Sequence, residues 1–395
     1  MLRYKRCTHT KRYRQKILKI KPMKRYILDT LKNIPGWRTS RKLVALSVDD
    51  YGNIRVNSRH ALHKLGQLGI KPENRFDKFD ALENREDLEA LFDTLSSVRD
   101  FQSRPAVLTA FSVPCNIDFS RTLTTDPPRY VYEILPNTFN RLEAEQPSEY
   151  QGAWQLWKEG INHGFLSPEF HGREHFHLAS FNAKLKQHDE ELSAVLGQKS
   201  NCCISASGKP YVSYTAAFHF TKINENNEFE KIIADGQIQF ERVFGQKASQ
   251  FNAPGGRESR LLHSYLCKLG FRFIDVPFIE KEHLGEGKFK RHVNWTGRNL
   301  SGLTAQVRNV VFEPNDNREA DWVGFAMKQI ERAFALRKPA IISSHRVNFS
   351  GHIEESNRNK GLSNLKELLS RTVKRWPDVE FVSGPELGQI INNHV

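Results

Sequence analysis

Two histidines four residues apart, His171 and His175, stand in a segment whose residue types suit metal chemistry. Side chains with this spacing can point the same way from one helical turn or from a tight bend. Two imidazoles presented in this way can bind one metal ion. Because the chain has 15 histidines, the pair alone does not separate a metal site from ordinary surface or core histidines. A third ligand, a base and an acid elsewhere in the sequence would make that distinction.

Further polar side chains follow apolar, β-rich segments. Asp49 and Asp50 come directly after one such run, Asp275 lies near the end of a later run, and His345 follows another. We predict each run to be a buried strand, so that these residues stand at the carboxyl ends of strands. In (β/α) barrels, that face carries the functional site. The sequence therefore predicts that these side chains meet the histidine pair around one centre.

Predicted strands alternate with amphipathic helices about seven times along the chain. The strand candidates are residues 43–48, 106–113, 165–170, 248–252, 271–276, 339–344 and 379–383, and residues 211–218 are expected to be another strand or a buried loop. This alternation is typical of an α/β protein with a parallel sheet, either open or closed into a barrel.

The residues at the strand ends can be assigned chemical roles. Catalytic zinc usually takes three protein ligands and keeps one position open, and Asp50 with the histidine pair would supply three. A metal held there would acidify water and polarise a carbonyl group. Asp49 could then take the proton of the water, and His345 could protonate the leaving group. We expect Asp275 to orient His345 and to keep it charged.

These motifs resemble those of the polysaccharide deacetylase superfamily, carbohydrate esterase family four. The resemblance extends over about residues 43–385 and is carried, in order, by the segments Ser47 to Gly52, His171 to His175, Phe251 to Gly256, and Ile342 to His345. It implies a distorted (β/α) barrel of about seven parallel strands with inserted loops. It also implies Asp49 as the base, Asp50 with both histidines as ligands of a divalent metal, with zinc as first candidate, and His345 as the acid. The implied substrate is a carbohydrate that carries N-acetyl or O-acetyl groups.

The chain departs from the family pattern at two places. Tyr51 separates the aspartate pair from Gly52, and Asn252 occupies the place of an arginine that contacts the base in the family. Arg257 is the candidate to replace that arginine. We expect Tyr51, through a nearby backbone N–H, and Asn252, Pro254 and Arg257 to contact the substrate. The departures leave open a degenerate deacetylase that binds a glycan without turnover.

A zinc peptidase is the alternative enzyme class, because His171-x-x-Glu174-His175 also fits the H-x-x-E-H motif. Glu174 would then be the general base, and both histidines would lie inside a helix. Pro168 and Gly172 instead favour a junction between a strand and a turn. The peptidase hypothesis also gives the aspartate pair no role.

Charge divides the sequence into two parts. Residues 1–42 hold 15 of the 59 Lys and Arg residues but only one of the 45 Asp and Glu residues, so the remainder is balanced. We expect 1–42 to be a basic, partly disordered extension that could contact nucleic acid, anionic lipid or an acidic glycan. Translation from Met23 would remove much of it. Residues 43–395 would form one barrel domain, with insertions near 114–150 and 281–317.

Composition limits the remaining classes. Hydrophobic residues make up 38% of the chain, which is typical of a globular protein. No segment reaches the roughly 18 apolar residues of a membrane span, and no apolar segment follows the basic N-terminus as in a signal peptide. The five cysteines include no C-x-x-C pair. The sequence therefore predicts a reduced, cytoplasmic protein without a membrane span.

Overall fold

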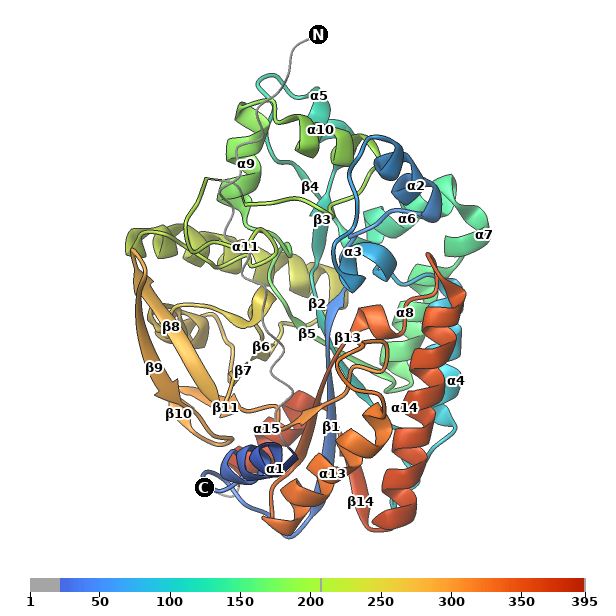
Figure 1. Cartoon of the computed structure of the whole chain (residues 1–395), viewed down its shortest axis with the longest axis vertical. Helices are drawn as coiled ribbons and strands as arrows, with labels where there is room; N and C mark the ends of the chain where they lie inside the picture. The colour runs from blue at the N-terminus through green and yellow to red at the C-terminus, as the bar shows by residue number, and fades with distance from the viewer. Residues whose placement is uncertain (1–21, 207, 394–395) are drawn as a thin grey trace.

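A curled sheet of ten strands organises the chain in the computed structural model, which describes residues 22–206 and 208–393 (Figure 1). The strand order is β10-β11-β7-β6-β5-β2-β1-β13-β12, and β14 also pairs with β1. The strands are β1 (Lys42–Tyr51), β2 (Leu108–Ser112), β5 (Leu166–Phe170), β6 (Gln250–Phe251), β7 (Phe273–Asp275), β10 (Asn299–Leu300), β11 (Leu303–Gln306), β12 (Val310–Val311), β13 (Ala340–His345) and β14 (Val379–Val382). All pairs are parallel except β10 with β11.

Strand β1 lies at the centre of the sheet because its residues are apolar on both faces and are buried from Leu43 onward. It pairs with β13 in a register that sets Asp49 opposite His345. Its pairing with β2 shifts register between Val48 and Tyr51, which is a β-bulge. The bulge falls at the carboxyl end of the strand, where the predicted site residues stand.

Helices cover the sheet, and apolar side chains fill the space between them. In Figure 1, α4, α8, α13 and α14 lie on one side, and α11 lies on the other. The long helices are α4 (Arg85–Ser96), α6 (Leu135–Glu145), α8 (Ala153–Asn162), α11 (Asn226–Phe244), α13 (Trp322–Ala335) and α14 (Glu355–Arg375). The shorter ones are α1 (Pro22–Leu31), α2 (Arg59–Gln67), α3 (Arg75–Phe79), α5 (Phe119–Thr124), α7 (Pro147–Tyr150), α9 (Leu178–Lys186), α10 (Glu190–Gly197), α12 (His263–Lys268) and α15 (Gly384–Asn392).

The predicted fold class, a distorted (β/α) barrel, is confirmed. Seven of the strand candidates each contain a strand of the central sheet, whereas residues 211–218, expected to be a strand or a buried loop, form turns and no strand. Segment 114–150 holds the hairpin of β3 (Cys115–Ile117) and β4 (Tyr132–Ile134) with α5, α6 and α7. No helix in the described part of the chain is both long and apolar enough to cross a membrane.

Two predicted boundaries need correction. Segment 281–317 is only partly an insertion: β8 (Ile279–Gly285) and β9 (Lys288–Val293) form a separate hairpin, but β10, β11 and β12 belong to the central sheet. These strands are two to four residues long, too short to show a period in sequence. Residues 1–21 of the predicted extension lie outside the described residues, whereas α1 packs on α13, where Gln329 donates to Asp29 at 3.0 Å.

Candidate metal centre

Asp50 stands at the bulge of β1, in a left-handed backbone conformation with φ of 78°. In a regular strand, neighbouring side chains point to opposite faces. The bulge breaks this alternation, so that Asp49 and Asp50 both reach the same end of the sheet. The side chain of Tyr51 is instead buried in the core, edge-on to Trp157 with 5.9 Å between ring centroids. Of the predicted substrate contacts, Tyr51 can therefore offer only its backbone.

The two histidines meet Asp50 directly. Oδ1 of Asp50 lies 2.8 Å from Nε2 of His175 and 3.6 Å from Nε2 of His171. All three residues are buried, and their potential ligand atoms lie within 4.8 Å of one another. The predicted ligand set is thus assembled at one point of the structure.

The segment between the histidines is a bend and not a helix. His171 follows β5, and its backbone N–H donates to the Ser112 carbonyl at 3.0 Å. Gly172 turns the chain with φ of 90°. A Cβ there would lie 2.8 Å from the Glu174 carbonyl oxygen and 3.1 Å from Pro254. The bend therefore needs glycine at position 172. Pro254 supports this bend, residues 171–175, which we call the histidine loop.

The protonation of the set suits a divalent metal. Nδ1 of His171 lies 2.9 Å from the Asn252 carbonyl, so it carries the proton and Nε2 keeps its lone pair. Burial opposes ionisation of Asp50, but the two adjacent imidazoles, His175 above all, hold the pKa of this carboxyl well below its usual range. Burial lowers the pKa of His175. A carboxylate with two imidazoles is a donor set that zinc and similar ions accept.

Asp49 is held by Arg308, a residue that the sequence analysis did not single out. Its guanidinium donates to both carboxylate oxygens of Asp49, at 2.7 and 2.8 Å, and its Nε donates to Asp275 at 2.6 Å. Asn252 adds a bond from Nδ2 to Oδ1 of Asp49 at 2.8 Å. Arg308, which follows β11, is thus the arginine that contacts Asp49, whereas Arg257 lies in a separate pocket.

His345 is paired with Glu313, which corrects the predicted partner Asp275. Nδ1 of His345 lies 2.6 Å from Glu313, whereas Asp275 accepts from Arg308 and Gln250. Burial opposes the charge of His345, but the adjacent Glu313 carboxylate outweighs it and raises the pKa of His345 to about 9. The same pairing lowers the pKa of Glu313 to about 2, against the effect of burial. His345 is thus protonated at neutral pH, with Nε2 3.9 Å from Oδ2 of Asp49.

The Glu174 carboxylate forms its hydrogen bonds with residues other than the three proposed metal ligands. Its carboxylate accepts from Arg173 at 2.6 and 3.0 Å and from Tyr130 at 3.4 Å. Arg173 also donates to Asp235 at 2.8 Å. A peptidase base would have to face the metal, and its histidines would lie on a helix. Neither condition of the H-x-x-E-H hypothesis is met by this arrangement.

A cleft of about 780 Å³ has Arg55 in its wall, and none of Asp50, His171 and His175 lines it. Arg55 and Asp77 line it as an ion pair of 2.8 Å, and its other walls come from residues 69–74, 201–206 and 212–215. The Asp50 carboxylate is among the charges that act on Arg55. The volume of the cleft falls within the usual range of ligand sites. Arg257, by contrast, is exposed in a separate pocket.

No family model matches the sequence, and no curated protein matches it. Similar solved structures include a presumed polysaccharide deacetylase from Mycobacterium smegmatis, 11% identical, with TM-score 0.43, covering 91% of this chain and 93% of that chain. A presumed glycoside hydrolase or deacetylase from Parabacteroides distasonis is 9% identical, with TM-score 0.46 and coverage of 90% and 72%. A family 4 acetyl xylan esterase from Clostridium thermocellum is 12% identical, with TM-score 0.33 and coverage of 88% and 91%. The structural neighbours of this chain thus include the group that its sequence motifs resemble.

Proposed function

We propose that this protein is a metal-dependent hydrolase that removes acetyl groups from a carbohydrate, as N-acetyl amides in the first place and O-acetyl esters in the second. One observation carries the proposal. A protonated His345 and the carboxylate of Asp49 stand 3.9 Å apart at the strand edge that also holds the three ligands. A base and an acid beside a metal are what hydrolysis of an acyl group requires. The acetylated carbohydrate comes from the motif resemblance.

The residues divide the reaction between them. Zinc or a similar ion on Asp50, His171 and His175 would supply Lewis acidity toward the acetyl carbonyl. Asp49 takes a proton from water as the water oxygen forms its bond to the carbonyl carbon. When the carbon–nitrogen bond breaks, His345 gives its proton to the departing amine, and acetate is the second product. Arg308 and Asn252 keep the Asp49 carboxylate in position throughout.

The decisive experiment combines metal analysis with acetate release. Purified protein is incubated with zinc and then with tri-N-acetylchitotriose, acetylated xylan or 4-nitrophenyl acetate, and acetate is measured enzymatically. We expect Asp49→Asn to keep its zinc and to lose about 10² to 10⁴ in kcat. Glu174→Gln, which alters the carboxylate of the peptidase hypothesis, should keep most activity. A zinc-loaded Asp49→Asn protein with full activity would refute the assignment of the base.

A second candidate is a glycan-binding protein without turnover. The observation that favours it is the three hydrogen bonds that Arg308 and Asn252 donate to Asp49, which occupy much of the carboxylate. The same substrates distinguish the two functions, because a binding protein would retain the acetylated oligosaccharide and release no acetate.

A further inference from the structure

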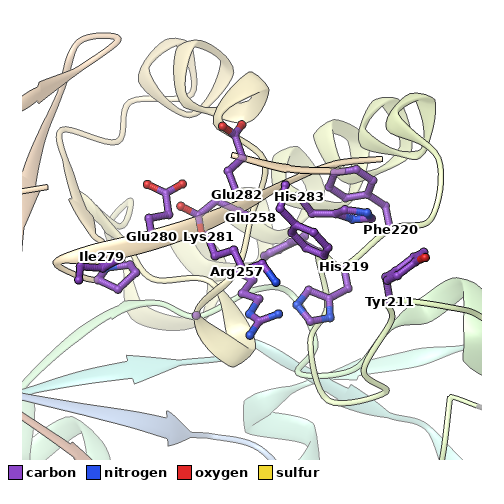
Figure 2. Close-up of a pocket in the computed structure, with 14 residues that line it drawn as sticks. Tyr211, His219, Phe220, Arg257, Glu258, Ile279, Glu280, Lys281, Glu282 and His283 are labelled. Atoms are coloured by element: carbon purple, nitrogen blue, oxygen red, sulfur yellow. The ribbon is translucent and has the colours of Figure 1, made fainter. Parts of the chain in front are cut away.

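Figure 2 shows a second pocket, of about 250 Å³, and Gly256 of the Pro254–Gly256 bend is one of the residues that line it. The bend contacts the histidine loop at Gly172 on one side and Ala216 on the other. The pocket is lined by the β8–β9 hairpin and by residues 218–220 and 256–258, with Tyr211 at its rim. Its volume is slightly below the ~300 Å³ at which drug-sized ligand sites begin. One ring-sized group therefore fits it, and a whole oligosaccharide does not.

The carboxylates of this pocket are already engaged. Each of the three forms a hydrogen bond or ion pair with a neighbouring side chain, namely Glu280 with Arg260 at 2.7 Å, Glu282 with His292 at 2.8 Å and Glu258 with His263 at 3.3 Å. Arg260 balances the negative charge of Glu280, whereas Glu282 and Glu258 are paired with imidazoles.

Three donors that line the same pocket have no such partner among the described residues, namely His219, Arg257 and Lys281, and Nζ of Lys281 lies 3.9 Å from the centroid of the Phe289 ring. The Ser213 N–H donates to Nδ1 of His219 at 3.1 Å, so Nε2 carries the ring proton. That Nε2 is buried and has no hydrogen-bond partner among the described residues. Arg257 is exposed and forms no ion pair with any described side chain, and Figure 2 shows it beside His219. Burial, and then the charge of Arg257, lower the pKa of His219 to about 4, so at neutral pH the ring is an uncharged donor.

The opposite wall is a stack of rings. His283 lies between Phe220 and Phe289, with centroid distances of 4.8 and 4.9 Å, and Tyr211 packs on His283 at 5.4 Å. Nε2 of His283 accepts from the Gly287 N–H at 3.0 Å, so this ring is satisfied. Tyr211 is 53% exposed and offers ring surface at the rim. An aromatic surface together with these unpaired donors suits a ligand with an apolar ring face and an anionic group.

We propose that this pocket binds a carboxylate-bearing sugar, with the carboxylate on Arg257 and on Nε2–H of His219, and the sugar ring against Tyr211. A carboxylate can accept two parallel hydrogen bonds from the planar fork of a guanidinium. Inorganic phosphate lacks the ring that would pack against Tyr211. The sugar identity rests on the proposed function, whereas the anion preference rests on the pocket alone. The glycan presented to the metal centre would then be an acidic one.

The test measures binding and not turnover, so it stands apart from the deacetylase proposal. Sodium glucuronate, glucose and inorganic phosphate are titrated calorimetrically into the zinc-loaded full chain and into its Asp49→Asn variant at pH 7. We expect glucuronate to bind both with a dissociation constant on the order of 1 mM, and glucose and phosphate to bind at least tenfold more weakly. Failure of acetate release with glucuronate binding intact would reject the enzyme and keep the pocket.

Matched variants locate the site. Arg257→Gln and His219→Phe should each weaken glucuronate binding about tenfold or more, because each removes a donor to a charged group. Lys288→Gln removes one positive charge, as Arg257→Gln does, at an exposed position of the β8–β9 hairpin. It should leave the affinity unchanged. Equal affinities for glucose and glucuronate, or equal effects of Arg257→Gln and Lys288→Gln, would overturn the proposal. Phosphate binding as tight as glucuronate binding would overturn the sugar acid and leave a general anion site.

Discussion

Arg308 shows how a buried charge cluster can present one catalytic group. Its guanidinium serves Asp49 on one side and Asp275 on the other, so one cation lies between two carboxylates. Burial raises the pKa of Asp275 even though Arg308 pulls it down. Such clusters are stable only while every member is present, because removal of one partner leaves an uncompensated buried charge. Asp275 thus acts by positioning Arg308, and through it Asp49.

The pairing of His345 with Glu313 sets the pH range of the proposed acid. A raised pKa means that His345 keeps its proton up to pH about 9. Activity that needs this proton should therefore persist through neutral pH and fall above about 9. In Glu313→Gln the main cause of the increase is removed, and the pKa should return toward the ordinary histidine value near 6.5. We expect the decline in kcat to begin at least one pH unit lower than in the wild type.

The measurement is kcat against pH from 5 to 10, with zinc present at saturation. Glu367→Gln, which breaks an exposed ion pair with Arg371, is the matched control and should follow the wild-type profile. Identical profiles for Glu313→Gln and the wild type would rule out His345 as the acid whose charge Glu313 maintains.

Secondary-structure elements explain which site residues could be predicted from sequence. Asp49, Asp50 and His345 end long apolar runs, and the carboxyl ends of parallel strands share one edge, so their proximity follows from the strand pattern. Arg308 and Glu313 follow β11 and β12, which are four and two residues long. Strands of this length are defined by the neighbours that they pair with, which the local sequence does not record. The pairing of Glu313 with His345, which are 32 residues apart, could therefore not be predicted from the sequence.

Substitution of Gly172 in the histidine loop can show whether the bend positions His171 and His175 for metal binding. Gly172 and Gly164 both have positive φ, of 90° and 72°, so alanine is strained at either position. Only at Gly172 would the new Cβ meet neighbours, at 2.8 Å from the Glu174 carbonyl, while nothing lies within 4 Å at Gly164. We expect both alanine variants to lose about 1 kcal/mol of unfolding free energy. Gly172→Ala should also bind zinc at least tenfold more weakly, since its loop must shift.

Zinc affinity is measured by competition with a chromogenic chelator, and stability by urea unfolding of the metal-free protein. The zinc affinities of the two variants are compared with each other, because the backbone strain is common to both. Equal zinc affinities in Gly172→Ala and Gly164→Ala would show that the ligands are positioned independently of the bend.

At the scale of the whole molecule, the metal site joins segments that are far apart in the chain. Asp50 comes from β1, and the histidines follow β5, with β2 between these strands in the sheet. A metal at this point would bind the folded state alone, because the three ligands are brought together only by the sheet. Helix α1 packs on α13, where Arg332 donates to the Tyr26 hydroxyl at 2.7 Å, whereas His345 lies at the far end of the following strand.

Metal binding should therefore increase the unfolding free energy of the whole protein, whether or not a substrate is present. At a free zinc concentration 100 times the dissociation constant, linkage predicts an increase of about 2.7 kcal/mol in the unfolding free energy. Asp50→Ala should lose this increase, whereas Asp49→Asn should retain it, which separates the ligand from the adjacent proposed base. Below pH about 5 the increase should fade in the wild type, because protonated imidazoles no longer bind zinc. The measurement is urea unfolding with zinc and with EDTA, and an undiminished zinc effect in Asp50→Ala would place the metal at a different site.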